Sequence, residues 1–304
     1  MTLIRPPQPP IRSMLFVPGN KPDWMRKAAN YGSDALIFDL EDSVPPDLKV
    51  GSRETVRQAI DEIGSRARPR LLVRINALHT GMAEDDLEAV VAPGLFGVQV
   101  PKTEDSDTVR ELDAVMCRLE QRAGLPAGQI FLMPLIEGAQ GVRNAYAIAM
   151  GASRVGYLNA CSGGSVGDMA LSVGYRESSL LETAYIFGKL VVDARAAGIA
   201  HPHSGLVTDP IHDLAAVRAR AERLRNFGYT GVSLIHPSHI ALANEVYGPS
   251  KADVAYWEGL VAAVEKAQRA GTSAVVYEGK MMDIAHLNYA REMLQQAAAF
   301  PDLN

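Results

Sequence analysis

Acidic residues follow directly on an apolar run in the stretch SDALIFDLEDSVPP, residues 33–46. Asp39, Glu41 and Asp42 come after residues of the kind that form a buried strand. Carboxylates this close repel one another, so their ionised forms need a nearby cation or an opening onto a polar site. The stretch therefore predicts a strand that ends at a charged site.

Charged residues also end other apolar runs. Arg74 ends RLLVR, Lys102 ends GVQVPK, Glu137 ends IFLMPLIE, His236 lies in GVSLIHP, and Asp168 lies a little beyond a sixth run. If the runs are parallel strands of one barrel, these side chains meet at its carboxyl-terminal end. Several acids sharing that end need more positive charge than an arginine and a lysine supply. Carboxylate oxygens, completed by water and substrate oxygens, suit Mg²⁺ better than zinc.

Eight short apolar runs alternate with stretches of helical periodicity. We predict strands at 14–19, 35–42, 70–76, 97–102, 130–137, 154–162, 199–205 (a weak signal) and 231–237. Two intervening stretches, 106–124 and 212–228, place apolar residues on one helical face, the first behind a cap at Ser106 or Asp107. Continuous rather than alternating apolar strands indicate a parallel sheet that is buried on both faces.

This alternation predicts an α/β fold, a (β/α)₈ TIM barrel over residues 12–237. A doubly wound open sheet is the alternative, but no GxGxxG motif follows the first strand. We expect residues 1–11 to form an N-terminal arm, stiffened by prolines. Residues 238–304 should form a helical C-terminal extension that packs on its own barrel or contacts a neighbouring subunit.

Each candidate also has a structural interpretation. Asp42 or Glu137 could cap a helix, and Arg74 could be an ion-pair partner without a substrate role. A metal-binding pair at His201 and His203 is less favoured than two ordinary loop histidines. Cys161 lies in no nucleophile motif and is interpreted as a small apolar residue at a strand end.

Composition limits the classes of partner. The 304 residues are 47% hydrophobic and 21% charged, with a net charge of −5 and no basic tract, which argues against nucleic acid and anionic membranes as partners. No apolar run approaches membrane-spanning length, and the two cysteines form no CxxC pair. The N-terminus has no apolar signal core, so a cytoplasmic location is expected.

Motifs along most of the chain resemble those of the citrate lyase β-subunit-like (CitE-like) family. They are RSMLFVPGNKPDWMRKA, DALIFDLEDSVPPDLK, LLVRINAL, VQVPKTE, PLIEGAQGVRNAYAIA, GDMALSVG, SLIHPSHIALANEVYGPS and GKMMDIAHL. This family belongs to the HpcH/HpaI aldolase group and is related to malyl-CoA and citramalyl-CoA lyases. The resemblance runs from about residue 12 to residue 295.

The resemblance implies a Mg²⁺-binding barrel that assembles into homo-oligomers, trimers or hexamers. Its metal ligands map to Glu137 and Asp168, and its carbonyl-polarising arginine maps to Arg74. Asp283, in the motif GKMMD, would be an acid/base donated across a subunit boundary. Glu41 and Asp42 would support catalysis near Arg74 and metal-bound water. We expect substrate-binding contacts from strand-end residues, namely Phe16, Pro18, Lys102, His236 and Pro237.

Two departures from the family pattern lie at the expected barrel mouth. The segment LNACSGGSVGDMAL, around residues 159–168, is longer than the usual GAED-like turn that leads to the second metal ligand. Ser204 stands where the family's IDG motif has an aspartate. Both changes affect the predicted metal geometry and substrate.

The resulting hypothesis is a Mg²⁺-dependent carbon–carbon lyase. It would cleave or form a short 3-hydroxyacyl-CoA, such as a malyl-, citramalyl- or citryl-type thioester, so a CoA thioester and a 2-keto acid are its expected partners. The alternatives are a CoA-independent 4-hydroxy-2-keto acid aldolase, an acyl-CoA thioesterase that uses the same site, and a non-catalytic partner subunit.

Overall fold

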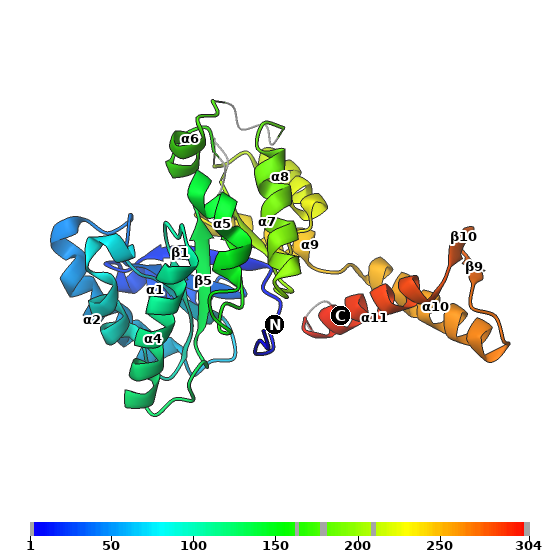
Figure 1. Cartoon of the computed structure of the whole chain (residues 1–304), viewed down its shortest axis with the longest axis horizontal. Coiled ribbons are helices and arrows are strands. Elements are labelled where there is room, and N and C mark those ends of the chain that lie inside the picture. The colour runs from blue at the N-terminus through cyan, green and yellow to red at the C-terminus, as the bar shows by residue number, and fades with distance from the viewer. Residues whose placement is uncertain (1–2, 162–163, 177–180, 208–210, 301–304) are drawn as a thin grey trace. The chain divides into compact units, whose positions relative to one another are not determined.

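A closed barrel of eight parallel strands forms the body of the chain (Figure 1). The computed structural model describes residues 3–161, 164–176, 181–207 and 211–300. Each strand pairs with the next along the chain, and the last pairs with the first. The strands are β1 Ser13–Pro18, β2 Ala35–Asp39, β3 Arg70–Arg74, β4 Leu95–Val100, β5 Phe131–Ile136, β6 Asn159–Ala160, β7 His203–Leu206 and β8 Gly231–Leu234.

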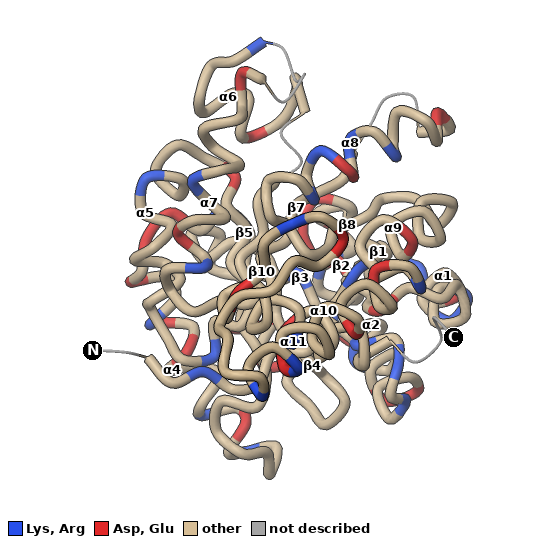
Figure 2. The backbone as a smooth tube through the Cα atoms, turned by 90° about the vertical axis from the view of Figure 1, so that its right-hand side faces the viewer, with Lys and Arg blue, Asp and Glu red and all other residues tan. Residues whose placement is uncertain are grey.

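Helices follow the barrel strands and cover the outside of the barrel. They are α1 Pro22–Ala28, α2 Lys49–Ile63, α3 Ala83–Val90, α4 Ser106–Arg122, α5 Ala139–Ala149, α6 Asp168–Val173, α7 Ala184–Ala196, α8 Leu214–Phe227 and α9 Ile240–Tyr247, with short 3₁₀ turns η1 Pro46–Leu48, η2 Leu78–Thr80 and η3 Pro237–His239. Figure 2 shows acidic and basic residues interspersed along α4 and α7. This is the pattern of helices that bury one face and expose the other.

The barrel and its eight strands confirm the predicted fold class. The predicted sixth strand, 154–162, is much longer than β6, although an isolated bridge joins Val155 to Leu132. Gly156 lies where a Cβ would come within 2.3 Å of the Phe131 ring, so this ring packs directly against the backbone of the irregular segment. The cap of α4 is Asp105, whose carboxylate accepts the Thr108 amide, and not Ser106 or Asp107.

Residues before β1 lie against the amino-terminal end of the barrel. The Arg5 guanidinium donates hydrogen bonds to the carbonyl oxygens of Ala149, Val155 and Ala197. Ala149 is the last residue of α5 and Ala197 follows α7, while Val155 lies in the segment before β6. Tyr157 donates its hydroxyl to the Pro9 carbonyl over 2.7 Å. Arginine at helix carboxyl termini offsets the negative end of the helix dipole.

Residues Glu245–Asn304 form a second compact unit. Helix α10 Lys251–Arg269 and helix α11 Ile284–Ala298 flank a hairpin of β9 Val275–Tyr277 and β10 Lys280–Met282. Leu260, Val264, Met282, Leu287 and Ala290 form its buried core. The hairpin was not predicted, since three-residue strands are too short to show a period in the sequence. No helix in the described ranges is both long and apolar enough to cross a bilayer.

Candidate active site at the barrel mouth

The acidic stretch after β2 is held together by Arg74, the last residue of β3. The Arg74 guanidinium donates two hydrogen bonds of 2.7 Å to the two carboxylate oxygens of Asp39. Asp39 also accepts the backbone amides of Glu41 and Ser43, which closes the turn after β2. Burial alone would raise the pKa of Asp39, but the bonds and charge of Arg74 lower it overall.

Arg74 and Lys102 both bind Glu41. An Arg74 nitrogen lies 3.0 Å from one carboxylate oxygen of Glu41, and Lys102 Nζ lies 2.7 Å from the other. Asp42, whose side chain is largely exposed, lies 3.8 Å from Arg74 and 3.6 Å from Lys102. Burial raises the pKa of Glu41, although the two cations oppose this effect. Three carboxylates therefore share two cations, which accounts for their close spacing in the sequence.

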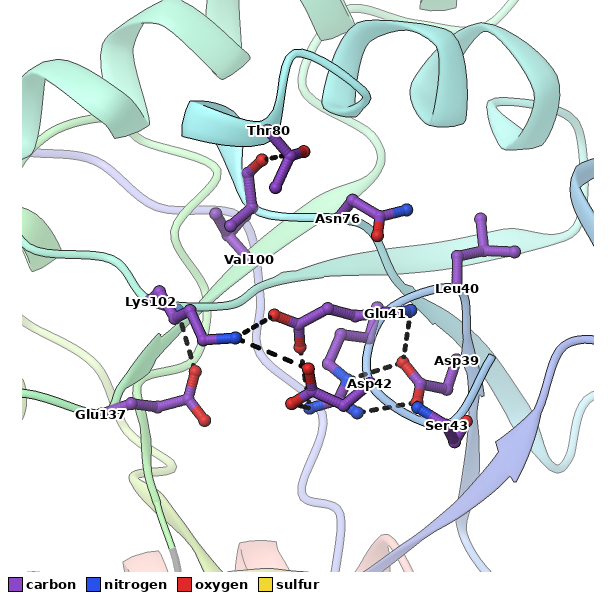
Figure 3. Close-up of polar contacts among 12 residues, drawn as sticks. Asp39, Leu40, Glu41, Asp42, Ser43, Asn76, Thr80, Val100, Lys102 and Glu137 are labelled. Atoms are coloured by element: carbon purple, nitrogen blue, oxygen red, sulfur yellow. Dashed lines mark hydrogen bonds and ion pairs between the residues drawn. The ribbon is translucent and has the colours of Figure 1, made fainter. Parts of the chain in front are cut away.

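Lys102 connects this network to Glu137, which follows β5. Its backbone amide donates a 2.9 Å hydrogen bond to the Glu137 carboxylate (Figure 3). The φ angle of Lys102 is 49°. Few residues other than glycine adopt this left-handed conformation, and it is enriched at functional sites. The turn after β4 thus places both the main chain and the side chain of Lys102 in the site.

Glu137 has an unusual protonation equilibrium. Burial raises its pKa to about 7, and the nearby charge of Glu41 adds to the shift, while the Lys102 amide opposes it. At neutral pH this carboxyl lies between its neutral and charged forms. A cation bound beside it would stabilise the charged form.

Glu137 and Asp168 line both lobes of a pocket at the mouth. The inner lobe, of about 200 Å³, also includes Phe16 and Arg74, and the outer lobe includes Lys102 and His79. Asp168 is the first residue of α6, beyond β6. The structure therefore brings together five of the predicted site residues, from separate strands, from the turns that follow strands and from the first turn of α6.

The donor set of this pocket fits Mg²⁺. Two carboxylates line the same cavity, and one of them is buried with a raised pKa. No group of three or more His, Cys, Asp or Glu side chains suited to a metal occurs among the residues that the structure describes. Oxygen atoms of water and substrate would complete the coordination, as is usual for Mg²⁺ and unlike a structural zinc site.

Of the other residues predicted to bind substrate, one lines the pocket and three do not. Phe16 lines the inner lobe, and the Arg74 guanidinium lies 4.9 Å from the centre of its ring. Pro18, His236 and Pro237 line neither lobe. His236 instead caps η3, accepting the Ser238 amide at Nδ1.

Asp283 lies in the second compact unit. Its carboxylate accepts the backbone amides of Ala285 and His286 and lies 2.7 Å from His286 Nδ1, so it caps α11. The hydrogen bond with His286 lowers the pKa of Asp283. The side chain is half exposed in this position. Its predicted acid/base role remains a prediction.

The contacts of Asp42, Glu137, His201 and His203 bear on whether these residues have purely structural roles. Neither Asp42 nor Glu137 caps a helix: the N-cap residues of α2 and α5 are Leu48 and Gly138, and no side chain caps either helix. His203, the first residue of β7, is fully buried and bonds to the Ile11 carbonyl at the amino-terminal end of the barrel. Burial lowers the pKa of His201 to about 3 and that of His203 to about 4, so both are neutral.

The structure describes Ser204 and most of the long segment before Asp168, the two departures from the family pattern. Ser204 is buried and donates its hydroxyl to the adjacent Gly205 carbonyl. Cys161 lines the inner lobe of the pocket directly after β6. Residues 162–163 of the long segment before Asp168 lie outside the described residues.

Sequence reasoning placed Asp39 in the acidic cluster but did not identify it as the principal partner of Arg74. Its position was the available signal. It is the last residue of β2 and pairs in register with Arg74 on β3, so the two side chains leave neighbouring strands at the same level. The opposite charges at matched strand ends could have been recognised once the strands were aligned.

Residues 12–237 match the HpcH/HpaI aldolase/citrate lyase family. The chain belongs to this family. It is 31% identical to the citrate lyase subunit beta of Leuconostoc mesenteroides over 288 residues, which cover 95% of this chain and 93% of that one. It is 32% identical to a (3S)-malyl-CoA thioesterase of Cereibacter sphaeroides over 292 residues, 95% of each chain.

A solved structure shows the same fold with ligands. The CitE protein of Mycobacterium tuberculosis, in complex with magnesium, acetoacetate and coenzyme A, has a TM-score of 0.72 and 27% identity, with 96% of this chain and 98% of that chain covered. The family thus includes lyase subunits and thioesterases, and members that bind Mg²⁺. The recognition made from sequence motifs is confirmed at family level.

Proposed function

We propose that this protein is a Mg²⁺-dependent carbon–carbon lyase that acts on a short 3-hydroxyacyl-CoA thioester. The observation that carries the proposal is the shared pocket, in which Glu137 and Asp168 lie with Arg74 at the mouth of the barrel. Magnesium- and coenzyme A-bound CitE, a relative of the same fold, supports both the cofactor and the thioester.

The reaction breaks the bond between the second and third carbons of the thioester. The hydroxyl proton leaves, the bonding electrons move to the thioester as an enolate, and the second carbon then gains a proton. Bound at Glu137 and Asp168, Mg²⁺ would supply Lewis-acid chemistry that acidifies the hydroxyl group. The products are a simple acyl thioester and a 2-oxo acid.

Arg74 would stabilise the negative charge that develops on the thioester oxygen. Burial disfavours its charged form, but the carboxylates of Asp39 and Glu41 raise its pKa, so it remains charged throughout the working pH range. Asp39 fixes the guanidinium plane through two bonds, so little reorganisation is needed when charge develops. Lys102 would keep Glu137 in position through its backbone amide.

Asp283 of a neighbouring copy would carry the proton to the second carbon. Its half-exposed carboxylate lies between a surface hairpin and α11, next to the exposed side chains of Met281 and Ile284. An exposed acid flanked by exposed apolar residues is suited to a site that a second chain completes. On this proposal the protein works as a homo-oligomer.

A condensation screen tests the function. The purified protein with Mg²⁺ is mixed with acetyl-CoA or propionyl-CoA and with glyoxylate, pyruvate or oxaloacetate, and adducts are detected by mass spectrometry. EDTA and Glu137→Ala should abolish the adduct, while Glu62→Ala, an exposed carboxylate on α2, should not. If Mg²⁺ binds and no adduct forms from any pair, the lyase proposal is wrong, and free-acid aldol chemistry becomes the next test.

Mixed oligomers test the role of Asp283. Glu137→Ala and Asp283→Ala should each be inactive alone. Co-expressed, they should regain activity, because an intact barrel on one subunit can meet an intact Asp283 on the other. Continued inactivity in confirmed mixed oligomers would contradict the donation of Asp283 between subunits.

Thioester hydrolysis is a second candidate, favoured by the similarity to (3S)-malyl-CoA thioesterases. It would use the same pocket and release free CoA and an acid. Free thiol measured with a chromogenic reagent distinguishes the two, because cleavage by a lyase leaves the thioester bond intact.

A further inference from the structure

The inner lobe of the pocket is walled mainly by apolar side chains. Apart from Arg74, Glu137 and Asp168, its large lining residues are Phe16, Leu135, Val166, Met169, Val207 and Ile235. The remaining wall consists of alanine and glycine residues, including Ala160 and Gly205, and of Cys161, Asn159 and Ser233. The Asn159 amide nitrogen donates a 2.8 Å hydrogen bond to the Ser233 hydroxyl, so these two polar groups partly satisfy each other. A ligand group that faces these walls loses water and gains few hydrogen bonds, so an apolar group is favoured there.

The positive charge that faces the pocket is already matched by carboxylates. Arg74 binds both oxygens of Asp39 and lies 3.0 Å from Glu41, and Lys102 Nζ lies 2.7 Å from Glu41. With Asp42 within 4 Å of both cations, three carboxylates face two positive charges. Neither cation is available to a further anionic group without losing a present partner.

Other cations contribute little to the lining. Among the described residues of the two lobes, the remaining basic side chain is His79, in the outer lobe. The undescribed residues include no Lys, Arg or His by sequence. Arg220 of α8 interacts electrostatically with Cys161 but does not itself line the pocket.

We infer that the 2-oxo acid handled by this site is a monocarboxylate with a short alkyl substituent, of the pyruvate or 2-oxobutyrate type, and not a dicarboxylate of the oxaloacetate type. The inference rests on the proposed function and specifies its substrate. The carboxylate next to the keto group would be held at the metal site. A second carboxylate would face the apolar walls without a counter-charge, whereas each buried methylene gains about fourfold in affinity.

Direct binding tests this selectivity without relying on turnover. Calorimetric titrations of the full-length, Mg²⁺-loaded protein would use pyruvate, 2-oxobutyrate, glyoxylate, oxaloacetate and the chemically stable dicarboxylate 2-oxoglutarate. We expect pyruvate and 2-oxobutyrate to bind at least about tenfold more tightly than either dicarboxylate. Glyoxylate, which carries only hydrogen at the alkyl position, should bind about fourfold more weakly than pyruvate.

A charge placed in the wall gives a matched comparison. Ile235 lines the inner lobe and is 44% exposed, so Ile235→Lys and the neutral control Ile235→Gln should both fold, which thermal melting checks. Ile235→Lys should strengthen oxaloacetate binding by about tenfold, and Ile235→Gln should not. Equal strengthening by both variants would contradict the charge argument.

The outcomes separate this inference from the proposed function. Oxaloacetate binding as tightly as pyruvate to the unmodified protein would overturn the inference alone, and loss of that binding in Arg220→Met would identify the overlooked counter-charge. If the protein binds Mg²⁺ but none of the oxo acids, the proposed function fails and this inference fails with it.

Discussion

The two ends of the barrel both bury charged residues, but they satisfy them to different degrees. At the amino-terminal end, Glu120 accepts the amides of Gly128 and Ile130 and an arginine bond from Arg154, all within 2.9 Å. At the carboxyl-terminal end, Glu137 accepts the Lys102 amide, and its pKa rises to about 7. One end is saturated with donors and stabilises the fold, while the other keeps negative charge that a bound cation can use.

The largest expected effect is at Glu137. Glu137→Ala should lower Mg²⁺-dependent activity by about 10³-fold, because metal stabilisation of developing charge supplies several kcal/mol. Mg²⁺ affinity, measured by calorimetry, should fall in parallel. Substituting the saturated carboxylate Glu120 should leave Mg²⁺ affinity unchanged in the folded fraction. Equal losses of affinity at both positions would remove the distinction between the two ends.

The loss of unfolding free energy should be larger for substitution of Glu120 than for substitution of Glu137, the reverse of the order expected for activity. Glu120→Ala would leave the Arg154 guanidinium, itself 1% exposed, without its buried partner. Breaking such a pair typically destabilises by about 3–5 kcal/mol. Urea unfolding followed by circular dichroism would measure this change, with Glu84→Ala, an exposed partner of Arg118, as the control. A loss below about 1 kcal/mol for Glu120→Ala would show that the amino-terminal network is dispensable.

The unfolding free energy of the metal-free protein should depend on pH through Glu137. The pKa of Glu137 rises from 4.5 to about 7 on folding, so the native state holds the proton more tightly than the unfolded chain. Its contribution to stability is therefore complete below about pH 4.5 and is lost as the pH rises through 7.

The variant Glu137→Gln keeps the oxygen that accepts the Lys102 amide but cannot ionise. Between about pH 5.5 and pH 8, the unmodified metal-free protein should lose about 2 kcal/mol of unfolding free energy relative to this variant. Saturating Mg²⁺ should reverse the difference, because the ion binds the native carboxylate. Parallel pH profiles for the two proteins in the absence of metal would contradict the raised pKa.

The smallest effect concerns the left-handed backbone at Lys102. Lys102→Gly and Lys102→Met both remove the ammonium group, but only glycine adopts the observed φ of 49° without steric cost. Lys102→Gly should therefore be about 1 kcal/mol more stable than Lys102→Met. Both should reduce activity through the loss of the contact with Glu41. If the two variants melt at the same temperature, the conformation of this residue is not strained.

Much of the barrel could be predicted from the sequence, because its strands are continuous apolar runs separated by periodic helices. The same logic located Arg74, Glu137 and Asp168, since charged residues at the ends of such runs must converge in a closed parallel barrel. Asp39 was less visible because its importance comes from the register between β2 and β3. Register depends on pairing between distant segments, which a single sequence does not show.

Short and irregular elements were harder to predict. The long run at 154–162 has the composition of a strand, yet within its described residues 154–161 regular pairing is confined to Asn159–Ala160. Gly156 in this run packs against the Phe131 ring, a tertiary contact that a single sequence does not show. The hairpin before Asp283 has two three-residue strands. Its conformation depends on the core between α10 and α11 more than on local propensity.

The brevity of β6 has a consequence for motion. This strand joins the ring through two register pairs on each side, whereas β1 and β2 are joined by five. The barrel therefore has few strand pairs between β5 and β7. Backbone amides in this region should exchange with solvent sooner than those of β1–β3. Asp168, the second proposed metal ligand, lies eight residues beyond the end of β6. We therefore expect its position to depend on the part of the barrel wall with the fewest strand pairs.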